Sequence, residues 1–285
     1  MPTPALEYLT TDDGQRLAYR RRGDGGEVLI APALCWLGDD LDRLAEGRTL
    51  VCYDHRGQGH SDPAGDDRIG FDRDVRDLEQ VRHAVGAERV SLLGWSYHGA
   101  VTAHYAHRHP DRVRRMVLAG PVAPRAQPHW RSYLQSFGRR LDTAALRRIE
   151  ELRRAGAPDH DPQAFGRAHV DLLLRVYVED PACLGGMRSQ PAVAPNLDIE
   201  RVNRQMLRVL EQLGDYDWRT SLRDLALPVL ILHGAADPVP IEGSREWLHV
   251  LRDGRLEEIP GCGHLAWLEQ PDRFFPPVEA FLAAD

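Results

Sequence analysis

The stretch Val90-Ser91-Leu92-Leu93-Gly94-Trp95-Ser96-Tyr97-His98-Gly99 decides the fold. It is an apolar run typical of a buried strand, and it passes through a glycine and a serine directly into a segment with helical spacing. Such a sharp turn holds the serine in a strained backbone conformation with its hydroxyl exposed. The first amides of the helix then point at an oxyanion that develops on a substrate. The stretch predicts a nucleophile at Ser96, although alone it also fits a serine that only caps a helix.

A serine nucleophile needs a base, and the base needs a carboxylate that orients it. The apolar run at residues 229–232 ends in a loop with Asp237, and the run that ends at Ile259 continues into a glycine loop with His264. Taken singly, each is more often a turn aspartate or a surface histidine. Three such residues in the order Ser, Asp, His, each after a predicted strand, favour a catalytic triad of Ser96, Asp237 and His264.

Strand-like and helix-like segments alternate in two blocks, with a purely helical stretch between them. The predicted strands span residues 6–9, 17–21, 28–31, 49–53, 90–93, 113–118, 228–233 and 255–259. The predicted helices of the two blocks span residues 73–85, 101–109, 242–250 and 271–282. This alternation predicts the α/β class with a mostly parallel, doubly wound sheet.

Residues 121–225 show no strand signal, and prolines break them into helical pieces. Helices are predicted there at residues 133–141, 143–154, 164–178 and 199–213. We interpret residues 121–225 as a helical lid inserted into an α/β core formed by residues 1–120 and 226–285.

Four stretches resemble the signature sequences of the α/β-hydrolase superfamily. They are Tyr53-Asp54-His55-Arg56-Gly57-Gln58-Gly59-His60-Ser61-Asp62, residues 94–99, residues 232–237 and residues 260–264. Within the superfamily the chain most resembles capped serine hydrolases related to proline iminopeptidases and small esterases. The resemblance implies that Ser96 is the nucleophile, His264 the general base and then acid, and Asp237 the carboxylate that orients it. Some members place that carboxylate after the sixth strand, but this chain reads Ala119-Gly120-Pro121 there.

The chain departs from the family pattern directly after the nucleophile. The family places a small residue two positions after the serine, whereas this chain has His98 there and a glycine one position later, at Gly99. We expect a slightly displaced helix to accommodate His98. A direct role of His98 in acid–base chemistry is the alternative, because histidine titrates near neutral pH.

The second departure lies in the oxyanion loop, which reads Ile30-Ala31-Pro32-Ala33-Leu34-Cys35 instead of the usual His-Gly. Pro32 has no amide to donate. One oxyanion donor is therefore expected to be the backbone amide of Leu34 or Ala33, with Leu34 preferred. The other is expected to be the amide of Tyr97, which follows the nucleophile.

Composition excludes several classes of function. The 285 residues carry 43 acidic and 36 basic side chains, and every basic one is arginine. Without lysine, Schiff-base, pyridoxal-phosphate and Walker P-loop chemistry are excluded. The net charge of −7 gives no field that attracts a nucleic acid. We expect a small-molecule substrate, no cofactor, no metal, no nucleic acid and no membrane, and the oligomeric state stays open.

Other features favour ordinary explanations. The pair Gly57 and Gly59 lacks the third glycine of a dinucleotide site, and a group of three histidines fits a helix end better than a metal site. These histidines are His104, His107 and His109. The four cysteines are widely spaced and predicted to be reduced core residues. No apolar run approaches the ~20 residues that span a bilayer and no signal-peptide pattern opens the chain, so a cytoplasmic location is expected.

The predicted function is a serine hydrolase that cleaves an ester, lactone or amide bond of a small apolar substrate through an acyl-enzyme. Aromatic residues near the predicted elbow and lid favour an apolar pocket. The candidate pocket residues are Trp36, Trp95, His98, Trp130 and Tyr133. One alternative is a non-hydrolytic cyclase or lyase that uses the same pocket. Another is an iminopeptidase-like aminopeptidase whose lid carboxylates hold an ammonium, and a third is a receptor that binds without turnover.

Overall fold

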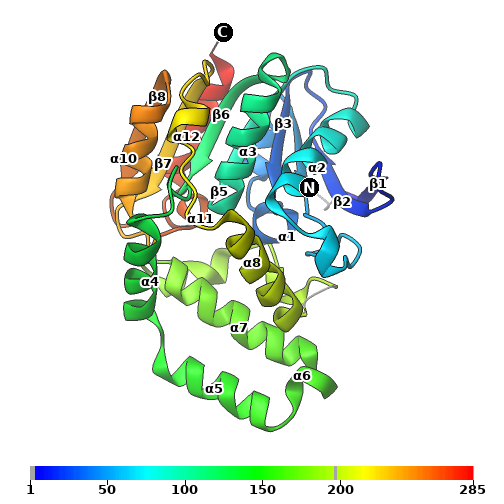
Figure 1. Cartoon of the computed structure of the whole chain (residues 1–285), viewed down its shortest axis with the longest axis vertical. Helices are drawn as coiled ribbons and strands as arrows, with labels where there is room; N and C mark the ends of the chain where they lie inside the picture. Colours follow the sequence, from blue (N-terminus) through cyan, green and yellow to red (C-terminus); the bar gives the residue numbers. More distant parts are fainter. Residues whose placement is uncertain (1–3, 196–197, 285) are drawn as a thin grey trace.

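The computed structural model describes residues 4–195 and 198–284. Its centre is an eight-stranded sheet with the order β1-β2-β4-β3-β5-β6-β7-β8 (Figure 1). The strands are β1 (Glu7–Thr10), β2 (Arg16–Arg22), β3 (Val28–Pro32), β4 (Thr49–Tyr53), β5 (Val90–Trp95), β6 (Val113–Ala119), β7 (Pro228–Gly234) and β8 (Asp253–Ile259). β2 pairs antiparallel with β1 and β4, and all other pairs are parallel. The predicted α/β class with a mostly parallel sheet is confirmed.

Helices cover both faces of the sheet, which explains why its central strands are mainly apolar. Every residue of β5 is buried. One face packs against α2 (Phe71–Ala84), α3 (Tyr97–Arg108) and α10 (Ile241–Val250). The other packs against α1 (Leu34–Leu37), α11 (Ala266–Glu269) and α12 (Pro271–Ala283). The four cysteines are free; three are buried, and Cys183 is half-buried.

A helical insertion connects β6 to β7, as the sequence predicted. It contains α4 (His129–Arg140), α5 (Thr143–Arg154), α6 (Ala157–His160), α7 (Pro162–Tyr177), α8 (Ile199–Leu213) and α9 (Arg219–Leu222). Short 3-10 helices at Pro181–Gly186 and Pro191–Val193 join α7 to α8. Figure 1 shows α4 to α8 gathered at one end of the sheet. We call this insertion the lid.

The two ends of the lid pair with each other where they leave the core. The amide of Ala126 donates to the carbonyl of Tyr216 at 2.8 Å, and that of Trp218 donates to the carbonyl of Pro124 at 2.8 Å. The lid therefore begins and ends in one short antiparallel contact.

A single carboxylate of the core binds both ends of the lid. Glu246 on α10 contacts Arg125 at 2.8 Å and His129 at 2.6 Å on the segment that enters the lid. It also contacts Arg219, on the segment that leaves the lid, at 3.2 Å. Glu246 thus anchors the base of the lid to the core.

Some short elements went unpredicted. A helix of four residues, such as α1 or α11, is too short to show a helical period in sequence. The same holds for the 3-10 helices at Asp42–Ala45, Asp66–Arg68 and Pro110–Arg112. α4 begins at His129, four residues before the predicted start, directly after Pro128. In the part of the chain that the structure describes, no helix combines the length and apolarity needed to cross a membrane.

Candidate active site

Ser96 lies in the sharp turn between β5 and α3. Its backbone has φ 55° and ψ −125°, a conformation that costs free energy for any residue with a side chain. The turn is tight because strand and helix approach without side chains between them. A Cβ on Gly94 would lie 2.7 Å from the Cα of Gly99. Gly99 thus permits the close packing of strand and helix that, in the family motif, a small residue permits one position earlier.

His98 is accommodated beside this turn by packing against another histidine. Its ring stacks on the ring of His55 with centroids 4.7 Å apart, and its Nδ1 lies 3.2 Å from the carbonyl oxygen of Trp95. His55 in turn contacts the buried carboxylate of Asp74 at 3.2 Å, and Asp74 accepts a hydrogen bond from the Tyr97 hydroxyl at 2.7 Å. Burial, with the charge of His55, lowers the pKa of His98 to about 3, which keeps its imidazole neutral at physiological pH.

Asp237 and His264 form a buried pair. Asp237 follows β7 and His264 follows β8, and His264 Nδ1 lies 2.7 Å from Asp237 Oδ2. Both side chains are at most 1% exposed. The second ring nitrogen, His264 Nε2, is buried and has no hydrogen-bond partner among the described residues. A buried polar atom without a partner is costly, and here it is the nitrogen that a serine nucleophile would use.

The backbone holds this pair from several sides. The amide of His264 donates to the carbonyl of Tyr177 at 2.6 Å, and its carbonyl accepts from the indole of Trp95 at 3.1 Å. Asp237 Oδ1 accepts from the amide of Val239 at 2.7 Å. The ring of Tyr177 lies 4.7 Å from that of His264. These contacts fix the position and rotation of the imidazole.

The two preferred oxyanion donors, the amides of Leu34 and Tyr97, each follow a residue with positive φ. Among the described residues, the non-glycine residues with positive φ are Ala33 (φ 76°) and Ser96 (φ 55°). Each directly precedes a helix, so Leu34 and Tyr97 are the first residues of α1 and α3. The first amides of a helix have no acceptor within it and are free to bind an anion.

A neighbouring amide is already occupied. The amide of Cys35 donates to Asp54 Oδ1 at 2.9 Å, and the amide of His60 donates to Asp54 Oδ2 at 2.9 Å. Gly59 lets Asp54 approach, because a Cβ there would lie 2.1 Å from Asp54 Oδ2. Asp54 thereby fixes the loop that carries Leu34, which explains chemically why the DHRGQG stretch accompanies the site.

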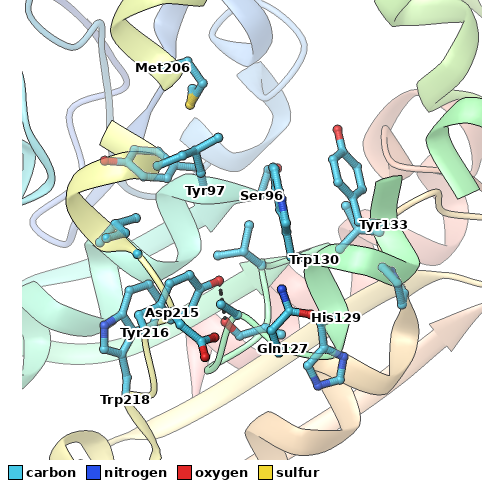
Figure 2. A pocket seen from close by; sticks show the side chains of 18 of the residues that line it. Ser96, Tyr97, Gln127, His129, Trp130, Tyr133, Met206, Asp215, Tyr216 and Trp218 are labelled. Carbon is cyan, nitrogen blue, oxygen red and sulfur yellow. Dashed lines mark hydrogen bonds between the residues drawn. The ribbon is translucent and has the colours of Figure 1, made fainter. Parts of the chain in front are cut away.

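Ser96 opens into a cavity of about 560 Å³ between core and lid (Figure 2). Its walls come from the start of α3, from α4 and α8, from the end of α7, and from the loop between α8 and α9. Trp130 and Tyr133 line it, as Figure 2 shows, whereas the other pocket candidates Trp36, Trp95 and His98 are not among its lining residues. Trp95 is buried beneath the site, and Trp36 packs against it with ring centroids 5.9 Å apart.

The cavity is mainly apolar and carries little charge. Aromatic and aliphatic side chains dominate its described lining, which contains no arginine although the chain has many. Its charged candidates are Asp215 and His129, and Glu246 already holds His129. Such a lining suits an uncharged apolar ligand and gives no counterion for an anionic one.

The lid carboxylates considered for an ammonium lie elsewhere. Glu150 pairs with Arg154 at 2.9 Å, Glu151 with Arg148 at 3.7 Å and Glu179 with Arg140 at 3.5 Å. The side chain of Asp180 accepts from the amide of Ala182 and caps a 3-10 helix. None of these four carboxylates is among the described residues that line the cavity.

The three histidines considered for a metal site are not among the described residues that line the cavity. His104 packs edge-on against Phe71 and Trp218, and burial lowers the pKa of His104 to about 4. Within the described ranges, no three His, Cys, Asp or Glu side chains come together as a metal site would require.

Sequence reasoning missed several residues that shape the site. Tyr177, Tyr216 and Trp218 line the cavity, and Tyr216 stacks on Trp218 with ring centroids 3.9 Å apart. Tyr177 ends α7, and Tyr216 and Trp218 lie where the lid returns to the core; aromatic side chains at such places look like ordinary packing in a sequence. Glu269 was also missed, although it follows His264 by only five residues.

A comparison with protein-family models matches residues 33–271 to the alpha/beta hydrolase fold. The chain belongs to the α/β-hydrolase fold family. Among solved α/β-hydrolase structures, an esterase from Exiguobacterium antarcticum covers 98% of this chain and all of its own with a TM-score of 0.74 at 20% identity. That likeness shows the fold and not the substrate.

Curated sequences with similarity to this α/β hydrolase carry different activities. A proline iminopeptidase from Heyndrickxia coagulans is 23% identical over 94% of this chain and 96% of its own length. A pimeloyl-[acyl-carrier protein] methyl ester esterase from Aromatoleum aromaticum is 32% identical over 64% of this chain and 69% of its own. The protein is thus a hydrolase-fold chain with esterase and peptidase relatives.

Proposed function

We propose that the protein is a serine hydrolase that cleaves a carboxylic ester, lactone or amide bond of a small, uncharged, apolar substrate, with esters preferred. One observation carries the proposal. His264 Nε2 is buried and unpartnered among the described residues while Nδ1 is bound to Asp237, and Ser96, in a strained turn, lines a cavity together with Tyr177, whose ring packs on that of His264. A serine that is activated through a histidine base needs a histidine oriented in this way, with one ring nitrogen held by a carboxylate and the other free.

The proposed reaction runs in two halves. Ser96 Oγ attacks the carbonyl carbon while His264 Nε2 takes the hydroxyl proton, and the amides of Tyr97 and Leu34 hold the oxyanion. The C–O bond to the leaving alcohol breaks, and His264 returns the proton to that oxygen. Water then attacks the acyl-enzyme with His264 again as base, which releases the acid and restores Ser96.

The test uses a small fluorophosphonate, which modifies activated serines, followed by intact-mass measurement. Wild type should gain one adduct and Ser96→Ala none. A panel of neutral aryl and alkyl esters should then be hydrolysed faster than matched esters that carry a carboxylate, because no arginine is among the described residues that line the cavity. A folded wild type that gains no adduct, or full turnover by Ser96→Ala, would overturn the proposal.

The aminopeptidase and cyclase alternatives receive less support. The four lid carboxylates considered for an ammonium are paired or capping outside the cavity, which leaves Asp215 as the carboxylate among its described lining residues. The cyclase alternative rests on His98, which stacks on His55 and is not among the cavity's described lining residues. Product formation that survives Ser96→Ala but not His98→Ala would restore the cyclase alternative.

A further inference from the structure

Glu269, at the end of α11, folds back over the loop that carries the proposed base. Its Oε2 accepts a hydrogen bond from the amide of Gly263 at 2.7 Å. Gly263 directly precedes His264 in the chain. Glu269 therefore holds the backbone at the point where the imidazole is attached.

The other oxygen of the same carboxylate binds the lid. Glu269 Oε1 accepts from the amide of Glu179 at 2.6 Å and from that of Asp180 at 3.4 Å. These residues follow α7 and precede the 3-10 helix at Pro181–Gly186. One side chain thus bridges two segments that lie about ninety positions apart in sequence.

A second contact brings the same two segments together. The carbonyl of Tyr177, at the end of α7, accepts from the amide of His264 at 2.6 Å. Gly263 is necessary for this approach, because a Cβ there would lie 2.2 Å from the Tyr177 carbonyl oxygen. The lid segment 177–180 and the loop 263–264 therefore form one hydrogen-bonded unit around Glu269.

We propose that Glu269 is a positioning residue that couples this lid segment to the general base, so that His264 is in catalytic register only while segment 177–180 is docked. The inference rests on the proposed function for its kinetic consequences, but the coupling itself is a property of the fold. It means that segment 177–180 stays fixed during turnover and that substrate enters past another part of the lid. The α4 side of the cavity fits this role, because α4 has no buried residue.

The chain offers two comparisons that separate positioning from simple attachment of the lid. Glu246 also binds lid to core, but through side chains of Arg125, His129 and Arg219 and away from the loop of His264. Glu279 lies on α12 and pairs only with Arg43 among the described contacts, at 2.7 Å. Glu246→Gln therefore tests loosening of the lid, and Glu279→Gln tests removal of a carboxylate that binds neither lid nor loop.

The experiment measures phosphonylation of Ser96 by the small fluorophosphonate, ester hydrolysis, and the low-field proton NMR resonance of His264 Nδ1. We expect Glu269→Gln, in which the amide nitrogen can no longer accept, to slow phosphonylation and lower kcat by about 10- to 100-fold. The Nδ1 resonance, identified by its absence from His264→Ala, should broaden or shift. Glu246→Gln should change KM more than the phosphonylation rate, and Glu279→Gln should match wild type. Circular dichroism and the unfolding midpoint establish that each variant is folded.

The outcomes separate the coupling from the proposed function. If wild type does not react with the probe, the proposed function fails, and the NMR resonance still tests the coupling. If Glu269→Gln reacts at the wild-type rate and keeps the resonance, the coupling is overturned. Equal slowing by Glu269→Gln and Glu246→Gln overturns it as well, because lid attachment alone would then explain the loss. Should Glu269→Gln fail to fold, Gly263→Ala, which pushes against the Tyr177 carbonyl, must broaden or shift the Nδ1 resonance or the proposal falls.

Discussion

Gly120 lies directly against the carboxylate of Asp237: a Cβ at position 120 would come within 2.8 Å of Asp237 Oδ2 and within 2.8 Å of His264 Nδ1. The backbone there has φ 50°, which glycine adopts without strain. Gly120 follows β6, where some members of the superfamily place the acid of the triad. In this chain the carboxylate that pairs with His264 is Asp237, which follows β7, and the space it occupies exists because position 120 has no side chain.

We therefore expect Gly120→Ala to separate Asp237 from His264 and to lower kcat by about 100-fold or more. The matched control is Gly86→Ala. Gly86 has φ 72°, and a Cβ at this position would meet nothing within 4 Å, so the control carries the backbone strain without the contact. Both variants should lose about 1 kcal/mol of unfolding free energy from strain, measured by urea denaturation. Equal activity of the two variants would show that Gly120 is not needed for the pair.

Replacing residues of the proposed triad should produce graded losses of activity. Ser96→Ala removes the nucleophile and should abolish turnover and probe labelling. Asp237→Asn keeps the shape of the side chain but favours the wrong imidazole tautomer, and we expect kcat to fall by about 10⁴-fold while slow labelling persists. Burst and steady-state kinetics with an activated ester measure the loss of turnover in both variants. If Asp237→Asn keeps the wild-type pH dependence of kcat and the wild-type labelling rate, the histidine base is not impaired, and that result would argue against the triad.

The residues of the proposed triad could be selected from the sequence because they follow strands of a parallel sheet. Ser96, Asp237 and His264 each follow a strand-like run, and parallel topology brings the ends of such strands to one edge of the sheet. Their assignment needed no knowledge of packing. The directions in which side chains on helices point were harder to predict, because they depend on the space that neighbouring elements leave in the folded protein.

His98 illustrates that limit. Its position beside Ser96 suggested access to substrate, but its ring turns onto His55, which comes from the loop after β4. Glu269 illustrates another. Glu269 binds the backbone amides of Gly263 and Glu179. Because every residue except proline has such an amide, the residue types at these positions give no sign of the hydrogen bonds. Contacts of this kind become visible only in three dimensions.

The loop that carries Leu34 should depend on the charge of Asp54. Asp54→Asn replaces one acceptor oxygen by an amino group that faces a backbone N–H, from either Cys35 or His60. We expect a loss of about 1 to 3 kcal/mol in unfolding free energy and a fall in kcat that exceeds the change in KM. Asp62→Asn, at an exposed carboxylate paired with Arg16, is the control and should change neither quantity appreciably. A wild-type kcat in Asp54→Asn would show that the loop held by Asp54 does not contribute to oxyanion stabilisation.

The stability of the protein should fall with acid partly through His98. Its folded-state pKa of about 3 lies below the ordinary value of about 6.5 expected in the unfolded chain. Between these values the unfolded state binds a proton that the folded state does not. His98 therefore leaves the free energy of unfolding unchanged above about pH 6.5 and lowers it progressively as the pH falls toward 3. His55 acts in the opposite sense: burial disfavours its charge, but Asp74 outweighs this and raises the pKa of His55.

His98→Gln removes the first effect and leaves His55 and Asp74 in place. The decrease in unfolding free energy from pH 7 to pH 5 should therefore be about 1 to 2 kcal/mol smaller in the variant than in wild type, whatever the variant's stability at pH 7. Urea denaturation at the two pH values measures this difference. His83→Gln, at an exposed position of α2, should keep the wild-type pH dependence. If His98→Gln also keeps it, then His98 takes up a proton in the folded state, and the stacked pair with His55 opens in acid.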